Sequence, residues 1–258
     1  MAQSRNANRA LTARSVVAST LLGTSPPRLP VAVLVRAGEL FGITEGTTRV
    51  ALSRMVAAGE VHPVDGTYEL AGRLLARQSR QLTSRAARTE DWNGSWLAAV
   101  LTVERRSAAE RTAWRAAMSN RRLAELREGV WMRPDNLGPV EALPPEVASH
   151  CTWLSGANPD DARALIRTLW DLDAWAARAT GLRRELRPLL RPLDRHDTRA
   201  LAPGFVMSAA VLRHFQADPL LPSELLPARW PGAALRDEYD RFDAAYRAVL
   251  REWFRANT

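Results

Sequence analysis

Lysine is absent from this sequence of 258 residues, so all 36 basic residues are arginine. We attribute that absence to a compositional bias rather than to function. Cysteine occurs once, at Cys151, which excludes an internal disulfide and a zinc site made of several thiolates. A reducing, cytoplasmic setting is therefore expected. The histidines are scattered, without the spacing of metal ligands, at His62, His150, His196 and His214.

Long apolar runs are also missing. The longest is "VAVLV" at Val31–Val35, which is far too short to span a bilayer. The N-terminal "MAQSRNANRALTARS" contains arginine but no apolar segment followed by a cleavage site, so we expect no secretory signal and no membrane association. A chain of this length is expected to fold into two or three compact domains.

Sequence signatures of catalysis are equally scarce. There is no Gly-rich phosphate loop, no nucleophile elbow and no zinc-protease motif. The sequence therefore predicts no catalytic residue, no metal and no cofactor, and the chain is not expected to be an enzyme.

Positive charge is concentrated in the first third. Residues 1–88 contain 12 arginines and five acidic residues, whereas the remaining 170 residues contain 24 arginines and 23 acidic residues. Of the total net charge of +8, the first part therefore carries +7 and the rest +1. This surplus predicts a polyanion-binding module joined to a nearly neutral body.

The stretch "TEGTTRVALSRMVAAG", from Thr44 to Gly59, predicts a helix with two different faces. Thr44 is an expected N-cap, and Gly59 is expected just after the helix. One face gathers side chains that suit a core, namely Thr48, Ala51, Leu52 and Met55. The opposite face carries threonine, valine and arginine without a ladder of Lys–Glu pairs, so we expect it to contact a partner.

Two helical patterns precede this helix and a hairpin follows it. Amphipathic stripes predict helices near residues 13–21 and 30–41, although "VAVLV" also fits a buried strand. After Gly59, two short extended runs flank Asp65–Gly66, a dipeptide typical of a tight hairpin turn. Three helices and a hairpin within about 60 residues, together with the basic surplus, predict a winged helix-turn-helix.

In that fold the third helix lies in the major groove of DNA. Arg49 would offer its forked guanidinium to guanine, and Val50 would contact a thymine methyl group. Thr47 and Ser53 would bond base edges or phosphates, whereas Arg54, at the margin, would hold a phosphate.

The hairpin supplies a second expected contact. Its turn at Gly66 and Thr67 would run along the DNA backbone or the minor groove. A dimerisation or scaffold module can contain the same order of elements, but the charge asymmetry favours DNA binding.

The middle of the chain alternates between strand and helix patterns. Trp96–Val103, Gly129–Pro134 and His150–Gly156 are typical of short strands, and Ala108–Arg127 and Pro159–Trp170 are typical of helices. The order strand, helix, strand, strand, helix predicts a small α+β sandwich of the ferredoxin-like type.

The last third predicts helices separated by a rigid loop. Trp170–Ala176 fits a helix packed through bulky side chains, and Leu235–Trp253 fits an amphipathic helix for a core or a dimer interface. Asp218–Gly232 contains four prolines and predicts a turn-rich strap. The basic stretch Arg183–Arg199, with its two internal prolines, is expected to be irregular and solvated; the alternative is a cradle for the phosphates of a CoA-like ligand.

Several segments, taken together, are typical of one known family. They are "ARSVVASTLLG", "FGITEGTTRVALSRMVAAGEV" and "GTYELAGRLL" in the first third, and "DWNGSWLAAVL" and "LREGVWMRPDNL" in the middle. The most specific are "WDLDAWA" at Trp170–Ala176 and "DPLLPSELLPARWPG" at Asp218–Gly232. In their order and spacing they resemble the PaaX family of bacterial transcriptional regulators over nearly the whole chain.

The resemblance implies an α+β protein in three parts. These are a winged helix-turn-helix with a connecting helix at residues 1–88, a ferredoxin-like (Cas2-like) middle domain at 89–165, and a mainly helical C-terminal domain at 166–258. The resemblance also implies a homodimer that represses transcription from a double-stranded DNA operator. An acyl-CoA or aryl-CoA effector, such as phenylacetyl-CoA, would release it.

Two further expectations concern chemistry. Trp131 and Arg133, in "GVWMRP", are the residues that we expect to face the ligand. Likeness to Cas2 also raises nuclease activity, for which Glu104 is the only nearby acid; without an evident second carboxylate, nuclease activity is not expected. The alternative function is an enzyme acting on nucleic acid or on a CoA ester, with the N-terminal part used for docking.

Overall fold

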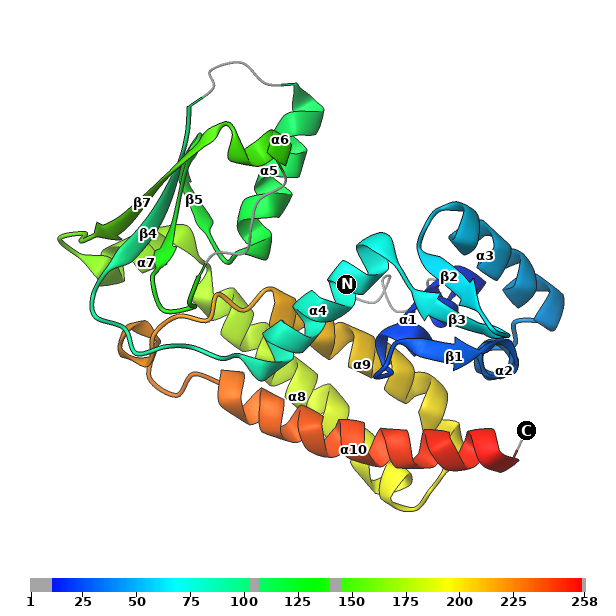
Figure 1. Cartoon of the computed structure of the whole chain (residues 1–258). Coiled ribbons are helices and arrows are strands. Elements are labelled where there is room, and N and C mark those ends of the chain that lie inside the picture. The colour runs from blue at the N-terminus through cyan, green and yellow to red at the C-terminus, as the bar shows by residue number, and fades with distance from the viewer. Residues whose placement is uncertain (1–10, 103–106, 140–144, 257–258) are drawn as a thin grey trace. The chain divides into compact units, whose positions relative to one another are not determined.

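The computed structural model of the chain describes residues 11–102, 107–139 and 145–256 (Figure 1). Helices and two antiparallel sheets make up these residues, which confirms the mixed α+β class. They divide into two compact units. The first unit combines the chain up to Leu82 with Arg184–Val211 and with the residues from Glu238 onward, and the second combines Thr83–Arg183 with Leu212–Asp237.

The N-terminal part of the first unit contains the predicted helices and hairpin. In chain order its elements are α1 (Ala13–Leu22), β1 (Arg28–Pro30), α2 (Val31–Glu39), α3 (Glu45–Ala57), β2 (Val61–Val64), β3 (Thr67–Leu70) and α4 (Gly72–Ala86), of which the residues from Thr83 onward belong to the second unit. The segment "VAVLV" is helical, so the alternative strand is wrong. Pro30, with φ −58° and ψ 147°, ends the extended segment and stands at the start of α2.

Strand β1 was not predicted. Its three residues pair with β3, with Arg28 opposite Glu69, and give a three-stranded sheet in the order β1-β3-β2. A strand of three residues is too short for an alternating pattern, so nothing in the local sequence indicates it.

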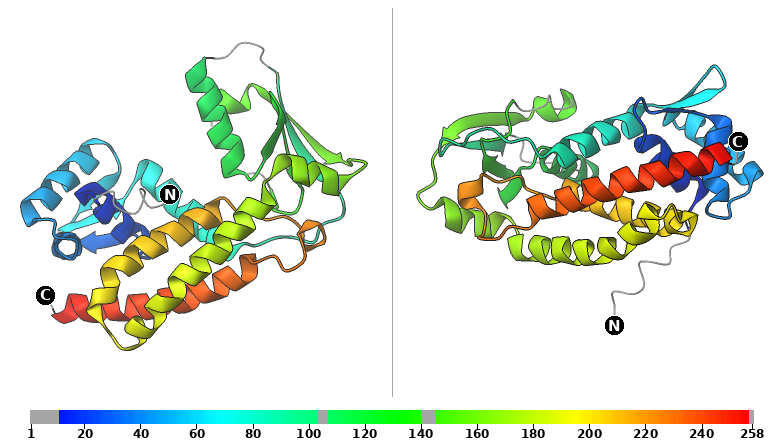
Figure 2. Two further views of the ribbon diagram at one scale, coloured as in Figure 1. Left: turned by 180° about the vertical axis from the view of Figure 1, so that it is seen from behind. Right: turned by 90° about the horizontal axis from the view of Figure 1, so that it is seen from below.

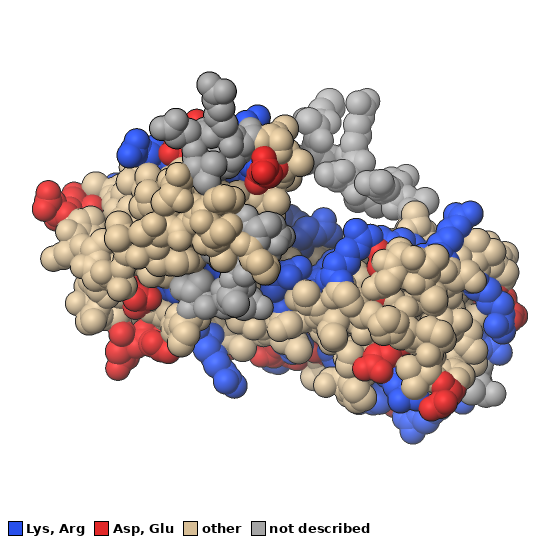
Figure 3. All heavy atoms as spheres, turned by 45° about the horizontal axis from the view of Figure 1, so that its top comes forward, with Lys and Arg blue, Asp and Glu red and all other residues tan. Residues whose placement is uncertain are grey.

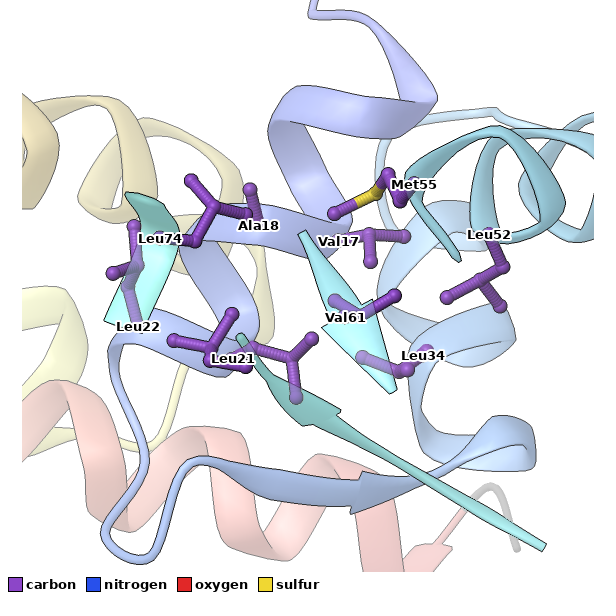
Figure 4. Packing of buried hydrophobic residues seen from close by; sticks show 10 residues of the cluster. Val17, Ala18, Leu21, Leu22, Leu34, Leu52, Met55, Val61 and Leu74 are labelled. Carbon is purple, nitrogen blue, oxygen red and sulfur yellow. The ribbon is translucent and has the colours of Figure 1, made fainter. Parts of the chain in front are cut away.

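One hydrophobic core joins α3 to the elements around it. Leu52 and Met55 of α3 are each 1% exposed, and they point toward Val17 of α1 and Val61 of β2 (Figure 4). Thr48, on the same side of the helix, is fully buried. Burial of one such aliphatic side chain stabilises the fold by roughly 1.5–3 kcal/mol. The predicted core face of α3 is therefore confirmed for these three residues.

Helix α2 meets α3 at a glycine. A Cβ atom on Gly38 would lie only 2.5 Å from Oγ1 of Thr48. The Thr48 hydroxyl donates to the carbonyl of Thr44 at 3.2 Å, so it is not free to move away without losing that bond. Glycine at position 38 thus allows the two helices to approach, and this contact helps to determine which face of α3 is buried.

A buried carboxylate ties three elements of this unit together. Glu60, between α3 and β2, is 1% exposed, and it accepts hydrogen bonds from Arg14 of α1, at 2.9 and 2.5 Å, and from Arg73 of α4. The bond from Arg14 is the main cause that lowers the pKa of Glu60, while burial acts in the opposite direction. The carboxylate stays charged because both arginines compensate for its removal from water.

The second unit is built on a four-stranded antiparallel sheet in the order β5-β6-β4-β7. Its first elements are β4 (Trp96–Leu101), α5 (Ala108–Asn120), β5 (Ala124–Arg127), β6 (Val130–Pro134), α6 (Pro145–Ala148), β7 (Cys151–Ala157) and α7 (Ala162–Leu169). Helix α5 covers one face of the sheet, where Trp114 packs against Ala99 and Trp131. On the opposite face, Trp96 packs against Ile166 of α7.

The predicted helix at Ala108–Arg127 is too long. Helix α5 ends at Asn120, and its last predicted residues form strand β5, in which Ala124 pairs with Met132 of β6. Arg122 adopts a φ of +65°, a left-handed conformation through which a right-handed helix cannot continue.

Helices dominate the last third, as predicted. They are α8 (Leu172–Asp194), η2 (Thr198–Ala200), α9 (Leu201–Gln216), η3 (Ser223–Leu225) and α10 (Gly232–Ala256). The parts of α8, α9 and α10 that belong to the first unit lie side by side (Figure 2). In the first unit, Arg187 of α8 pairs with Glu238 of α10 at 2.8 Å, and the hydroxyl groups of Ser208 and Tyr239 are 2.9 Å apart. The segment around η3 is turn-rich, as its prolines predict.

The prediction that Arg183–Arg199 is irregular is wrong. Helix α8 continues to Asp194 and includes Pro188 and Pro192. Leu186 and Leu193, two turns apart on one side of the helix, are almost fully buried and stabilise it. Pro188 is exposed, so water can bond the carbonyl that this proline leaves without a donor.

Substitution of Gly38 tests the contact between α2 and α3. Gly38→Ala is expected to lower the free energy of unfolding by about 1–3 kcal/mol, because its Cβ would displace the Thr48 hydroxyl. Gly46 of α3 is the matched control, since nothing lies within 4 Å of a Cβ there, and Gly46→Ala is expected to raise stability by up to about 1 kcal/mol. Urea unfolding followed by circular dichroism measures both; a Gly38→Ala variant as stable as the wild type would contradict the contact.

Acid unfolding tests the role of Glu60. Because folding lowers the pKa of Glu60 from its ordinary 4.5, its contribution is complete above that pH and is lost as the pH falls toward the folded-state value. Glu60→Gln is expected to cost about 1–3 kcal/mol at neutral pH and less in acid. Glu39→Gln, which removes a surface pair with Arg36, should cost no more than about 1 kcal/mol. Urea midpoints measured across the pH range give this loss of stability. If the loss caused by Glu60→Gln did not become smaller below pH 4.5, the role of Glu60 would be contradicted.

Candidate nucleic-acid interface

Helix α3 exposes the face opposite its core. Thr47, Arg49, Val50, Ser53 and Arg54 are all exposed, and Val50 retains 51% of its surface in water. The core contacts of the helix leave this face uncovered within the described part of the chain. The structure thus brings the five predicted helix residues together on one surface, where hydroxyl, methyl and guanidinium groups stand side by side.

The two arginines of this face differ in their surroundings. Arg49 donates from Nε to Oε1 of Glu45 at 2.7 Å, and both side chains are more than half exposed. An exposed pair of this kind stabilises a protein by about 0–1 kcal/mol, so Arg49 can exchange Glu45 for another acceptor at small cost. Arg54 forms no hydrogen bond or ion pair with the residues that the structure describes, and its guanidinium is available for a phosphate.

Thr44 caps the start of α3, as predicted. Its hydroxyl oxygen accepts from the backbone N–H of Thr47 at 3.3 Å and lies 2.9 Å from the hydroxyl of Thr47. A hydroxyl group that takes part in one hydrogen bond can still form another, so Thr47 remains competent to bond a partner. Gly46 is also exposed and leaves the backbone of this first turn accessible to a bulky molecule.

The hairpin turn has the two-residue form that its sequence predicts. Asp65 and Gly66 both adopt positive φ angles, of 46° and 73°. Arg28 holds the turn, because its guanidinium donates to Oγ1 of Thr67 at 2.6 Å and to the carbonyl of Val64 at 3.3 Å. Gly66 is exposed, whereas Thr67 is partly buried and engaged within the turn. The role of Arg28 was not predicted, since it depends on pairing between segments far apart in sequence.

Arginine side chains also reach the surface elsewhere in the molecule, at several places in the view of Figure 3. Within the N-terminal part, Arg14 and Arg73 are used to neutralise Glu60. Arg49 and Arg54 therefore provide the positive charge on the exposed face of α3 itself.

The residues predicted to face a ligand, Trp131 and Arg133, lie on one side of β6. Both are buried, with 4% and 3% of their surface exposed. Trp131 belongs to the core beneath α5, and Arg133 donates to the carbonyls of Pro134 at 2.9 Å and Gly138 at 3.3 Å. Burial lowers the pKa of Arg133, and its Nε has no partner among the described residues. Their contact with a ligand remains a prediction.

A buried cluster of polar side chains holds the start of the segment Asp218–Gly232 in place. Asp218 accepts from Arg236 at 2.8 Å, and the two side chains are 3% and 14% exposed. Arg122 donates to the carbonyl of Asp218 at 2.7 Å and to carbonyls at the end of α9, where the helix dipole favours a cation. Its other amino group donates to the hydroxyl of Ser84 at 2.5 Å. The cluster joins α4, α9 and α10 to the loop before β5 within the second unit.

Two other tryptophans, Trp175 and Trp230, pack in an aromatic stack. Trp175 stacks on His214, with ring centroids 4.3 Å apart, and on Trp230, at 4.5 Å. Burial in this stack lowers the pKa of His214 to about 4, so its imidazole is neutral at neutral pH. Trp175 is 7% exposed, which confirms the prediction that it serves packing.

Other kinds of site find no support in the described residues. No group of three or more His, Cys, Asp or Glu side chains there could hold a metal ion. None of the helices described is both long enough and apolar enough to cross a membrane. Glu104, the only nuclease candidate, lies outside the described residues.

Comparison with known proteins identifies the family. The model of the PaaX-like protein family matches residues 12–74, and that of the PaaX-like protein C-terminal domain matches residues 170–256. None of the curated proteins matches the chain. Among solved structures, the chain is similar to "Uncharacterized protein Rv0674 from Mycobacterium tuberculosis", with 40% identity and a TM-score of 0.68. That similarity covers 94% of this chain and 98% of the other. These matches cover the N-terminal and the C-terminal parts of the chain, and they show that the chain belongs to the PaaX-like family.

Proposed function

We propose that this protein is a DNA-binding transcriptional regulator, a dimeric repressor that leaves its operator when an acyl-CoA or aryl-CoA binds. The observation that carries the proposal is the exposed face of α3, whose opposite face is fixed in the N-terminal core. Membership of the PaaX-like family supports a regulatory role. The uncompensated positive charge of residues 1–88 supports a nucleic-acid partner.

In this proposal, α1, α2, α3 and the β2–β3 hairpin form a winged helix-turn-helix. Gly42, with a φ of +70°, permits the tight turn between α2 and α3. A helix with its side chains is about 10–12 Å wide and fits the major groove, which is about 12 Å wide. The turn at Gly66 and Thr67 is the wing, placed along the backbone or the minor groove.

The exposed side chains then divide into two kinds of contact. Arg49, Val50, Thr47 and Ser53 lie toward base edges, with the Arg49 fork on guanine and the Val50 methyl groups on thymine. Arg54 holds a phosphate, which contributes to affinity but not to sequence preference. Because Arg49 is held only by an exposed pair with Glu45, its release for DNA costs little.

The rest of the chain would bind the ligand and couple that binding to release from DNA. The sheet order β5-β6-β4-β7, with α5 between β4 and β5, supports a ferredoxin-like middle domain. We accordingly retain the three-part division at residues 1–88, 89–165 and 166–258. Trp131 and Arg133 are our candidates for the aromatic and anionic ends of an aryl-CoA. Since both are buried, a ligand would have to bind a state in which this face opens, and prefer that state to the DNA-bound one.

Binding to the DNA that flanks the protein's own gene tests the proposal. Arg49→Ala is expected to cost about 1–3 kcal/mol on the preferred sequence and to relax base preference. Arg54→Ala should weaken binding to all sequences alike and lower the slope of log K against log salt by about one. Fluorescence anisotropy in a salt series measures both effects, with Arg127→Ala, an exposed arginine of β5, as the control.

Two outcomes of that series would refute the groove assignment. One is wild-type affinity in both α3 variants. The other is an equal loss in Arg127→Ala, which would indicate that any exposed arginine contributes in the same way.

Release by the ligand is a separate prediction. Addition of phenylacetyl-CoA or a related acyl-CoA is expected to dissociate the operator complex, whereas free CoA at the same concentration is not. Mobility shift on the same DNA measures the dissociation. Complexes that persist through a panel of aryl-CoA and acyl-CoA thioesters would remove these ligands from the proposal while leaving DNA binding intact.

A further inference from the structure

The elements of the proposed winged helix are packed into a larger body. The first unit joins the chain up to Leu82 to Arg184–Val211 and to the residues from Glu238 onward, so parts of α8, α9 and α10 belong to it. Helix α1 is buried accordingly over roughly two thirds of its circumference, through Ala13, Val16, Val17, Ala18, Leu21 and Leu22. A helix that faces a single core usually buries a narrower stripe.

The first contact with the C-terminal helices lies at the turn between α2 and α3. Phe41, in that turn, meets Phe205 of α9 with ring centroids 4.8 Å apart, and both residues are half-buried. The N–H groups of Phe41 and Ile43 donate to the carbonyl of Gly38 at 2.9 and 3.0 Å, which ties the turn to α2. Gly38 is also the residue that packs against Thr48 of α3. The ring of Phe205 therefore contacts the turn that fixes α3.

The second contact lies at the end of α1. Arg247 of α10 donates from Nη1 to the carbonyl of Gly23, the C-cap of α1, at 2.6 Å. Its Nε donates to Asp243, one turn earlier on α10, at 2.9 Å, and this bond directs the guanidinium. A cation at the C-terminal end of a helix is favoured by the helix dipole. Because Val17 of α1 packs in the same core as α3, this bond links α10 to the support of α3.

Both contact residues come from one closely packed pair of helices. A Cβ atom on Gly204 of α9 would lie only 2.8 Å from Cδ2 of Tyr246 of α10, so glycine at position 204 allows the two helices to approach. Phe205 directly follows this glycine, and Arg247 directly follows the tyrosine. The pair of α9 and α10 thus presents two contacts, one to each side of the α3 core.

We propose that Phe205 and Arg247 are positioning residues for the DNA interface, because they hold α3 in one orientation on the C-terminal helices. The inference rests on the proposed function, since the orientation of α3 matters for binding only if α3 lies against DNA. A dimer presents two recognition helices to half-sites about 34–36 Å apart, so each helix needs a defined orientation within its own subunit. Fixing that orientation before DNA binds removes an ordering cost that weakens a complex.

Double electron–electron resonance on the full chain tests the positioning without DNA. In a Cys151→Ala background, spin labels on two exposed residues, at Val50→Cys of α3 and Ala244→Cys of α10, report the distance between these helices. Dilution with unlabelled protein restricts the measurement to distances within one chain. The labelled parent is expected to give one narrow distribution, and Phe205→Ala combined with Arg247→Gln a broader one. Phe205→Tyr, which keeps the ring, should retain the narrow distribution.

The same helices offer matched controls. Val206 follows Phe205 on α9 and is 46% exposed, and Arg251 is exposed one turn after Arg247 on α10. Neither Val206→Ala nor Arg251→Gln is expected to broaden the distribution. Circular dichroism checks that each variant is folded; if the double variant is not, each single variant is expected to broaden the distribution by less. Contact variants as narrow as the parent, or controls as broad as the contact variants, would overturn the inference.

The spacing of the half-sites tests the consequence for binding. Two base pairs inserted between the half-sites of the operator turn one of them by roughly 70° relative to the other. The wild type is expected to lose about tenfold or more in affinity, equivalent to about 1.4 kcal/mol. Phe205→Ala should bind the native spacing more weakly and lose less on insertion, because its α3 is free to adjust. Fluorescence anisotropy measures this ratio, which a simple loss of folded protein leaves unchanged; a ratio equal to that of the wild type would contradict the positioning role.

Failure of the positioning role can be told apart from failure of the proposed function. If the contact variants broaden the distance distribution but wild-type protein binds no DNA flanking its gene, the two contacts stand as the support of α3 and the regulatory role fails. If wild-type protein binds that DNA while Phe205→Ala changes neither the distribution nor the dependence on spacing, the regulatory role stands and the inference fails.

Discussion

The contact between Gly38 of α2 and Thr48 of α3 is the constraint on which the proposed interface depends. It allows two helices to approach closely enough for one face of α3 to be sealed, with Leu52 and Met55 in the core. Rotation of α3 by a single residue, about 100°, would carry either Arg49 or Arg54, depending on its direction, toward that core and part of the apolar face into water. The identity of the exposed face is therefore a consequence of packing on the opposite one.

The far end of α3 is held by electrostatics instead. Glu60 lies just before β2, after the turn that ends α3, and it pairs with Arg14 and Arg73, so the path from α3 into the hairpin is fixed on α1 and α4. Since these two arginines are engaged with Glu60, the positive charge left on the α3 face comes from Arg49 and Arg54. A weak surface pair and an arginine without a described partner suit a surface that exchanges water and ions for phosphates.

The sequence predicts those parts of the fold that local patterns determine. Helical periodicity located α3 and its two faces, and Asp65–Gly66 located the hairpin, because each signal lies within a few residues. Strand β5 was predicted wrongly because it is decided by pairing with β6, and the helical stretch around the prolines of α8 because it depends on burial of Leu186 and Leu193 of the same helix in the folded chain. The support that Arg28 gives to the wing depends on such a distant pairing too.

The central claim, that the exposed face of α3 lies against DNA bases, is tested most directly by site-specific cross-linking. In a Cys151→Ala background, Val50→Cys would be offered DNA that carries a disulfide-modified base, with Leu126→Cys, another exposed position, as the reference. We expect cross-links at position 50 that depend on the place of the modified base in the operator. Protein that binds the operator yet cross-links no better from position 50 than from position 126 would contradict it.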